Sequence, residues 1–192
     1  DWPGLPFLQE KSEAAMTSAS AEDIRAFYAD HVPETGAGAL SLARAHLVAD
    51  DREASNAVVT EAWLTLSLTS EEQAAFVAAY SDVLAPLHTQ RLDMALWRGW
   101  SSNARAMFPL VYEGWRRLAN ARLGLRADAG GVDTLIDAVP ATLSADAGLA
   151  YERFAWRVRK GRTEDAVALL QARSASAGTL GKPEFWSGQR RN

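Results

Sequence analysis

The chain has 192 residues, of which 48% are hydrophobic and 23% are charged, proportions typical of a folded protein with a continuous core. It contains no cysteine, which excludes disulfides, thiolate metal sites and cysteine nucleophiles. The formal net charge of −4 does not provide the basic field that nucleic-acid binding needs, so nucleic acid is not an expected partner. No apolar run approaches the roughly 18 residues that cross a bilayer, so no transmembrane segment is expected.

Residues 1–38 are predicted to form an extended lead-in followed by the first helices. Prolines and a glycine near the start favour extended backbone. Ser20, which is followed by two acidic residues, is typical of a helix N-cap, and Pro33 should end the helix that begins there.

Residues 39–181 are predicted to form a helical-repeat region, because one sequence phrase recurs in it. An arginine is followed thirteen positions later by an alanine, and between them a helix runs into a polar break and a second helix. Such repeats indicate helix pairs stacked side by side, since a single pair cannot bury its apolar face alone. The pairs are Arg44/Ala57, Arg91/Ala104 and Arg153/Ala166.

The spacing of apolar residues predicts the fold class. Leu40, Ala43 and Leu47 share one helical face, and few segments alternate apolar and polar residues as a strand would. We predict an all-α fold, a superhelical stack of antiparallel helix pairs (an α-solenoid or horseshoe) with about ten to twelve helices. Residues 182–192 should begin a segment that leads to a linker or catalytic domain, and we expect the natural chain to continue beyond Asn192, because no helix-ending signal occurs there.

Few residues are arranged for chemistry. The three histidines, His31, His46 and His88, include no pair at the spacing that places two imidazoles on one helical face. The sequence has no nucleophile elbow, phosphate-binding loop or dinucleotide fingerprint. Acidic pairs lie at predicted helix starts, where capping explains them better than acid–base catalysis. We therefore expect no metal, cofactor or catalytic residue in this chain.

Three of the seven tryptophans are followed directly by arginine. A functional interpretation makes them a platform that stacks on sugars and has cationic edges. The preferred interpretation is that the tryptophans fill gaps between helices while the arginines reach water. The candidate surface for a glycan or a protein partner consists of Trp97, Arg98, Arg105, Trp115, Arg116, Arg117 and Arg157.

Several segments, in this order, resemble the α-superhelical region of soluble lytic murein transglycosylases. Together they span nearly the whole chain, and the last looks like the tryptophan-rich segment that leads to the linker domain of that family. The segments are Asp1–Gly4, Leu42–Ala45, Arg91–Asp93 with Leu96–Trp97, Val132–Ile136 with Val139–Pro140, Gly148–Arg153 with Trp156–Arg157 and Arg159–Gly161, and Lys182–Trp186 with Arg190–Arg191.

The resemblance implies a ring or horseshoe of helices that carries a C-terminal lysozyme-like domain. In that family this domain cuts the β-1,4 bond between N-acetylmuramic acid and N-acetylglucosamine and leaves a 1,6-anhydro product. A single glutamate, in an Ile-x-x-Glu-Ser type motif, acts there as acid and then as base. No Glu-Ser dipeptide occurs in this chain, so no catalytic residue is transferred to it and the chain alone should be inactive.

The leading hypothesis is therefore a non-catalytic helical scaffold in the periplasm, in a parent protein that could associate with the outer membrane. Its expected partners are peptidoglycan glycan strands, the attached lysozyme-like domain and other cell-wall proteins. The alternative is a freestanding helical-repeat module that binds a polypeptide segment in its concave groove. An unrelated α-helical enzyme has little support, because no nucleophile, metal or phosphate constellation is present.

Overall fold

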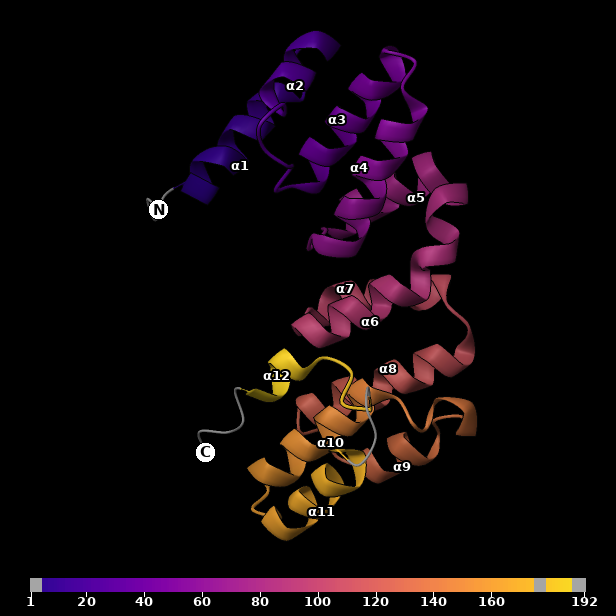
Figure 1. Ribbon diagram of the computed structural model, residues 1–192. Helices are drawn as coiled ribbons and strands as arrows, with labels where there is room; N and C mark the ends of the chain where they lie inside the picture. Colours follow the sequence, from indigo (N-terminus) through magenta and orange to yellow (C-terminus); the bar gives the residue numbers. More distant parts are fainter. Residues whose placement is uncertain (1–4, 175–178, 188–192) are drawn as a thin grey trace. The chain divides into compact units, whose positions relative to one another are not determined.

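A computed structural model describes residues 5–174 and 179–187, which form helices α1 to α12, three short 3-10 helices and no strand (Figure 1). Sequential helices pack against one another, so the prediction of an all-α stack of helices is confirmed. The chain divides into two compact units: Asp1–Ala95 with Ser102–Leu110, and Leu96–Ser101 with Val111–Asn192. The division between them falls inside the predicted repeat region.

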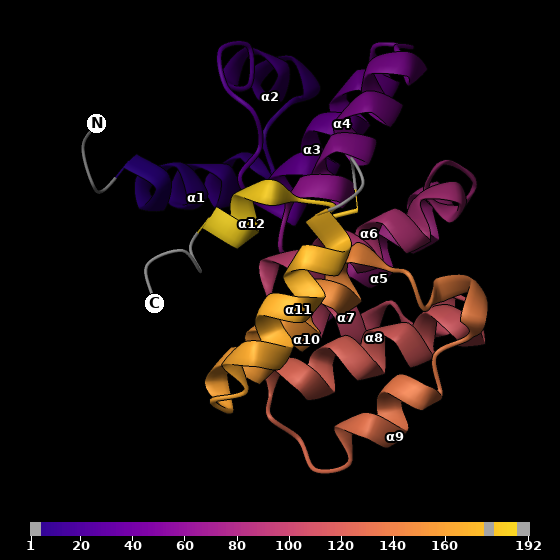
Figure 2. The ribbon, with the colours of Figure 1, turned by 60° about the horizontal axis from the view of Figure 1, so that its bottom comes forward.

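The first unit is built around α3. This helix packs against α1, α2, α4 and α5, and Figure 2 shows α3 and α4 side by side. Most of the α3 residues are buried, and many of them are glycine or alanine, which lets the neighbouring helices approach closely. The end of α6 and the first residue of α7 belong to the second unit. The bounds are α1 (Leu5–Met16), α2 (Ala21–Phe27), α3 (Gly36–Val48), α4 (Arg52–Thr65), α5 (Ser70–Leu84), η1 (Ala85–Leu87), α6 (His88–Arg98), α7 (Ser101–Ala106) and η2 (Phe108–Leu110).

Capping explains why α3 begins at Gly36, inside the predicted lead-in. The Thr35 side chain accepts a hydrogen bond from the backbone N–H of Gly38, as an N-cap residue does. Glu13 of α1 is buried and accepts hydrogen bonds from the backbone N–H groups of Glu34 (2.7 Å) and Thr35 (2.9 Å). The start of α3 is therefore tied to α1.

The buried Arg91 binds backbone carbonyl groups at the C-terminal end of α4. Arg91 of α6 is 0% exposed, and its guanidinium carbon lies 4.4 Å from the centre of the Trp63 ring. The guanidinium donates to the Trp63 and Leu66 carbonyls and, over 3.0 Å, to Asn103 Oδ1, which also accepts from the Leu68 N–H. A cation at the end of a helix is stabilised by the carbonyl groups left unpaired there, although burial lowers the pKa of Arg91 to about 10.

The second unit is built on α8 and α10. Helix α8 packs against α9 and α10, and α10 packs against α11, as Figure 2 also shows. One cluster of buried residues, which includes Leu118, Leu125 and Leu149, joins α8, α9 and α10. A second cluster joins α10, α11 and α12 through Phe154, Ala166 and Trp186. The bounds are α8 (Glu113–Arg126), α9 (Val132–Asp137), η3 (Ala141–Leu143), α10 (Ala147–Arg159), α11 (Thr163–Ser174) and α12 (Pro183–Ser187).

The recurring Arg/Ala phrase marks three helix pairs, α3–α4, α6–α7 and α10–α11, as predicted. Helices α3, α8 and α10 each end in the same type of turn, in which one residue adopts a positive φ. The following N–H then bonds back into the last turn of the helix, which pairs a carbonyl that would otherwise stay free. These bonds are Asp51 N–His46 O, Ala129 N–Gly124 O and Arg162 N–Arg157 O, each 2.9 Å long.

Candidate functional site

The two units carry opposite charge. By sequence, the second unit has fourteen Lys and Arg against nine Asp and Glu, a formal charge of +5, whereas the first has six against fifteen, a formal charge of −9. These values add up to the −4 of the whole chain. The average therefore conceals a basic unit, and an anionic ligand would be attracted to the second unit rather than to the first.

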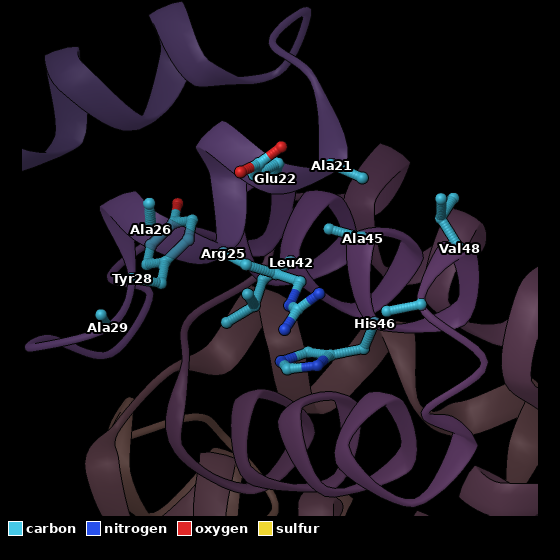
Figure 3. Close-up of a pocket in the computed structure, with 11 residues that line it drawn as sticks. Ala21, Glu22, Arg25, Ala26, Tyr28, Ala29, Leu42, Ala45, His46 and Val48 are labelled. Atoms are coloured by element: carbon cyan, nitrogen blue, oxygen red, sulfur yellow. The ribbon is translucent and has the colours of Figure 1, made fainter.

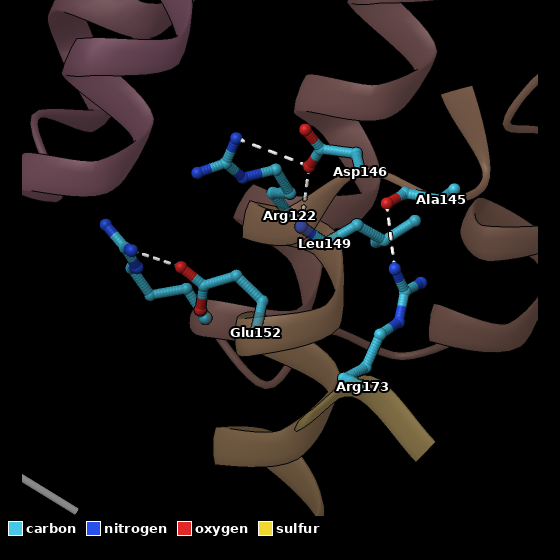
Figure 4. A network of polar contacts seen from close by, with 7 residues as sticks. Arg122, Ala145, Asp146, Leu149, Glu152 and Arg173 are labelled. Atoms are coloured by element: carbon cyan, nitrogen blue, oxygen red, sulfur yellow. Dashed lines mark hydrogen bonds and ion pairs between the residues drawn. The ribbon is translucent and has the colours of Figure 1, made fainter. Parts of the chain in front are cut away.

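Part of this positive charge is used inside the second unit. Arg122 is buried, and its guanidinium lies 3.5 Å from the carboxylate of Asp146, which caps α10 by accepting from the Leu149 N–H at 2.7 Å (Figure 4). Arg126 pairs with the buried Glu152. Burial raises the pKa of the Glu152 carboxyl, and the arginine opposes that rise. These ion pairs join α8 to α10.

Of the two tryptophans of the candidate surface, Trp97 lies in the core and Trp115 packs at its edge. Trp97 is only 4% exposed, and its ring packs against Tyr151 and Phe185 at centroid distances of 5.4 and 5.1 Å. Trp115 is partly buried against the cluster that joins α8, α9 and α10. Trp97 therefore does not present an open face on which a sugar could stack, which corresponds to the preferred interpretation of the Trp-Arg pairs.

The predicted arginines are divided between the two units. Arg98 of the second unit is exposed and lies 5.1 Å from the centre of the Trp100 ring, whereas Arg105 is exposed on the first unit. Arg116 and Arg117 both pair with Glu113 of their own helix, and the hydrogen bond from Arg117 is the main cause that lowers the pKa of that carboxyl. Six of the seven predicted residues thus belong to the second unit, and their role in binding stays a prediction.

Helices α10 and α11 carry three partly buried arginines, Arg153, Arg157 and Arg173, and of these the sequence had singled out only Arg157 as a ligand-binding residue. We call these three residues the α10–α11 arginines. Arg153 and Arg157 are one helical turn apart on α10, and Arg173 of α11 donates to the Ala145 carbonyl at 2.9 Å, just before α10 begins (Figure 4). All three side chains are partly buried.

The α10–α11 arginines make no ion pair with a carboxylate among the described residues. Within the described residues, Arg153 makes no hydrogen bond or ion pair, and Arg157 and Arg173 each donate only to a backbone carbonyl. Burial lowers the pKa of Arg153, and the nearby charges of Arg157 and Arg173 lower it further, while the exposed Asp133 opposes this shift. The spacing of Arg153 and Arg157 is visible in the sequence, but the contact of Arg173 with the Ala145 carbonyl depends on how α11 packs against α10.

A groove of about 740 Å³ lies between α2 and α3 in the first unit. Figure 3 shows its lining, in which Arg25 and His46 accompany apolar side chains such as Leu42. Among the residues that the structure places, no three His, Asp or Glu side chains come together as metal ligands would. No helix in the described ranges combines the length and the apolar character that crossing a membrane requires.

Comparison with protein-family models, with curated proteins and with solved structures finds no match to this chain.

Proposed function

We propose that this chain is the non-catalytic helical scaffold of a periplasmic lytic transglycosylase, and that its second unit binds peptidoglycan. The observation that carries the proposal is the position of the residues of α10 that resemble the family. Gly148–Arg153, Trp156–Arg157 and Arg159–Gly161 lie in α10 and the turn after it, and they include Leu149 and Trp156 of the cluster that joins α8, α9 and α10. The same residues carry four of the basic side chains of the second unit, Arg153, Arg157, Arg159 and Lys160.

A scaffold role agrees with the state of the buried carboxyl groups. A glycosidase needs a sheltered acid that can exchange a proton with its substrate. Among the described residues, the two buried acids are Glu13 and Glu152. Glu13 accepts hydrogen bonds from the chain just before α3, and Glu152 is paired with Arg126. Both carboxylates stabilise the fold, so the cutting reaction is assigned to a domain attached to this chain.

Co-sedimentation with purified peptidoglycan sacculi tests the proposal. We expect the chain to sediment with sacculi at low ionic strength and to be released by salt, because exposed charges are screened within about 10 Å at 0.1 M salt. Charge reversal in the second unit (R98E, R116E and R117E together) should weaken binding several-fold. The matched reversal of three exposed arginines in the acidic first unit (R25E, R44E and R52E) should not.

Two results would contradict the scaffold. One is that the folded wild-type chain stays in the supernatant with sacculi at low salt. The other is that the chain alone releases 1,6-anhydro-muropeptides, which would make it the enzyme rather than its scaffold.

The groove between α2 and α3 favours a second candidate, a helical-repeat module that binds a polypeptide segment. Its apolar floor and its charged and polar edge are suited to an amphipathic helix. This alternative predicts a polypeptide partner and no affinity for sacculi. A bulky substitution at an exposed position of the lining, A49W, should then abolish capture of the partner and leave sacculus binding unchanged.

A further inference from the structure

We propose that the groove between α2 and α3 binds an amphipathic helix of a partner protein, and that Arg25 and His46 bind a carboxylate of that helix. The groove has a volume of about 740 Å³, and all the residues that line it belong to the first unit. Such binding is separate from the proposed scaffold role, which assigns peptidoglycan to the second unit, and it specifies the partner of the second candidate function.

The lining of the groove favours a helix as its occupant. Leu42, Ala45 and Ala49 follow one helical face along α3 and its C-cap, because they are spaced by three and four residues. On α2, Glu22 and Ala26 are one turn apart. Two helices that present such faces side by side leave a furrow for a third, and the small alanine side chains let its backbone come within the packing distance of about 8–10 Å.

Apolar side chains at the groove are left exposed. Val48, which lines it, is 77% exposed, and Leu47 beside it is 40% exposed. Ala26, Ala29 and Ala49 of the lining are exposed as well. A helix that lies in the groove would remove this apolar surface from water, which favours binding.

Two basic side chains of the groove have no acidic partner within the chain. Figure 3 shows the guanidinium of Arg25 directed toward the imidazole of His46. Each residue lies in the last turn of its helix, where the helix dipole stabilises positive charge. Among the described residues, neither side chain makes a hydrogen bond or an ion pair. A carboxylate of the partner would accept hydrogen bonds from both side chains.

Glu22 determines the direction in which the helix lies. It also lines the groove, and Figure 3 shows it apart from Arg25 and His46. Its carboxylate makes no hydrogen bond or ion pair with the residues that the structure places. The formal charge of −9 on the first unit disfavours a helix that is acidic throughout. The occupant therefore has an apolar face, a carboxylate opposite Arg25 and His46, and a basic residue opposite Glu22.

A peptide selection against the immobilised full chain tests this assignment. The library holds peptides of the length of α3, with apolar residues repeated at helical spacing and random residues beside this stripe. We expect the bound peptides to be enriched in Asp or Glu at one position beside the stripe and in Lys or Arg at another. The acidic residue would face Arg25 and His46, and the basic residue would face Glu22.

Fluorescence anisotropy with the tightest of these peptides measures the contribution of Arg25. R25E should lower the affinity about tenfold, because the attraction becomes a repulsion between like charges. A peptide in which Lys replaces the acidic residue should regain affinity for R25E, which a merely structural role of Arg25 would not produce. R44E, on α3 but outside the groove, is the matched control and should bind the original peptide as the wild type does.

Three results would overturn the assignment. The first is a selection that enriches no charged residue beside the stripe. The second is a selected peptide that binds R25E and A49W as tightly as the wild type, because it would not lie in the groove. The third is self-association of the wild-type chain, measured by sedimentation velocity, that A49W abolishes, because a second copy of the chain would then be the occupant.

The groove and the scaffold role fail separately. A chain that sediments with sacculi but selects no peptide would lose only the groove as a binding site. A chain that binds the selected peptide through Arg25 but stays in the supernatant with sacculi would keep the groove and lose the scaffold role.

Discussion

At the scale of single residues, the same sequence phrase produces arginines in three different environments. Arg91 is fully buried, Arg153 is partly buried and Arg44 is exposed. The sequence could predict that each lies in the first helix of a pair, because the spacing of apolar residues reports helices. It could not predict the burial of Arg91, which depends on residues 63–68 and on Asn103 meeting it from other parts of the chain.

The difference between Arg91 and Arg44 gives a stability prediction. Replacing Arg91 with Met keeps an unbranched apolar stem but removes one of the two donors to Asn103 Oδ1 and the donor to the carbonyl groups at the end of α4. We expect R91M to lower the free energy of unfolding by about 3 kcal/mol, because buried acceptors lose their partner. Urea denaturation followed by tryptophan fluorescence measures the change.

R44M is the matched control, since Arg44 occupies the same place in the repeated phrase and is exposed. It should change the free energy of unfolding by no more than about 0.5 kcal/mol. If R91M were as mild as R44M, the guanidinium would not be what holds the end of α4.

At the scale of helices, α10 is the element on which the second unit depends. One side of it packs with α8 and α9, another with α11 and α12, and a third carries Arg153 and Arg157. Its extent could be predicted, since Gly161 follows it and polar residues flank it. What the sequence could not reveal is why Gly148 stands in its first turn, because the reason is Arg122 of α8.

Gly148 leaves room for the buried guanidinium of Arg122. A Cβ atom at this position would overlap the guanidinium, which Asp146 and the Trp97 ring hold in place. Helix propensity alone predicts that G148A stabilises the chain by about 1 kcal/mol. We expect the opposite sign, a loss of about 2 kcal/mol in the free energy of unfolding, because the buried side chain must move.

A double-mutant cycle isolates the cause of this effect. In an R122M background the cost of G148A should shrink, because the overlapping atoms are gone. G130A serves as control, since a Cβ atom there would meet no other atom within 4 Å. A stabilising G148A in the wild-type background would show that Arg122 does not occupy this space.

At the scale of the whole molecule, the chain divides into an acidic first unit and a basic second unit. The charges can be counted from the sequence, but the boundary between them cannot, since Leu96–Ser101 belongs with the second unit while Ser102–Leu110 belongs with the first. The same holds for the arginines of α10 and α11. Arg157 was singled out from its Trp-Arg pair, whereas the contact of Arg173 with Ala145 depends on the packing of α11 on α10.

The central claim, that this chain is the scaffold of a wall-cleaving enzyme, is tested most directly by reading the coding sequence that adjoins Asn192. We predict that the reading frame continues into a linker and a lysozyme-like segment that contains an Ile-x-x-Glu-Ser type motif. A stop codon directly after Asn192, or a following domain without such a glutamate, would contradict the claim and favour the freestanding helical-repeat module.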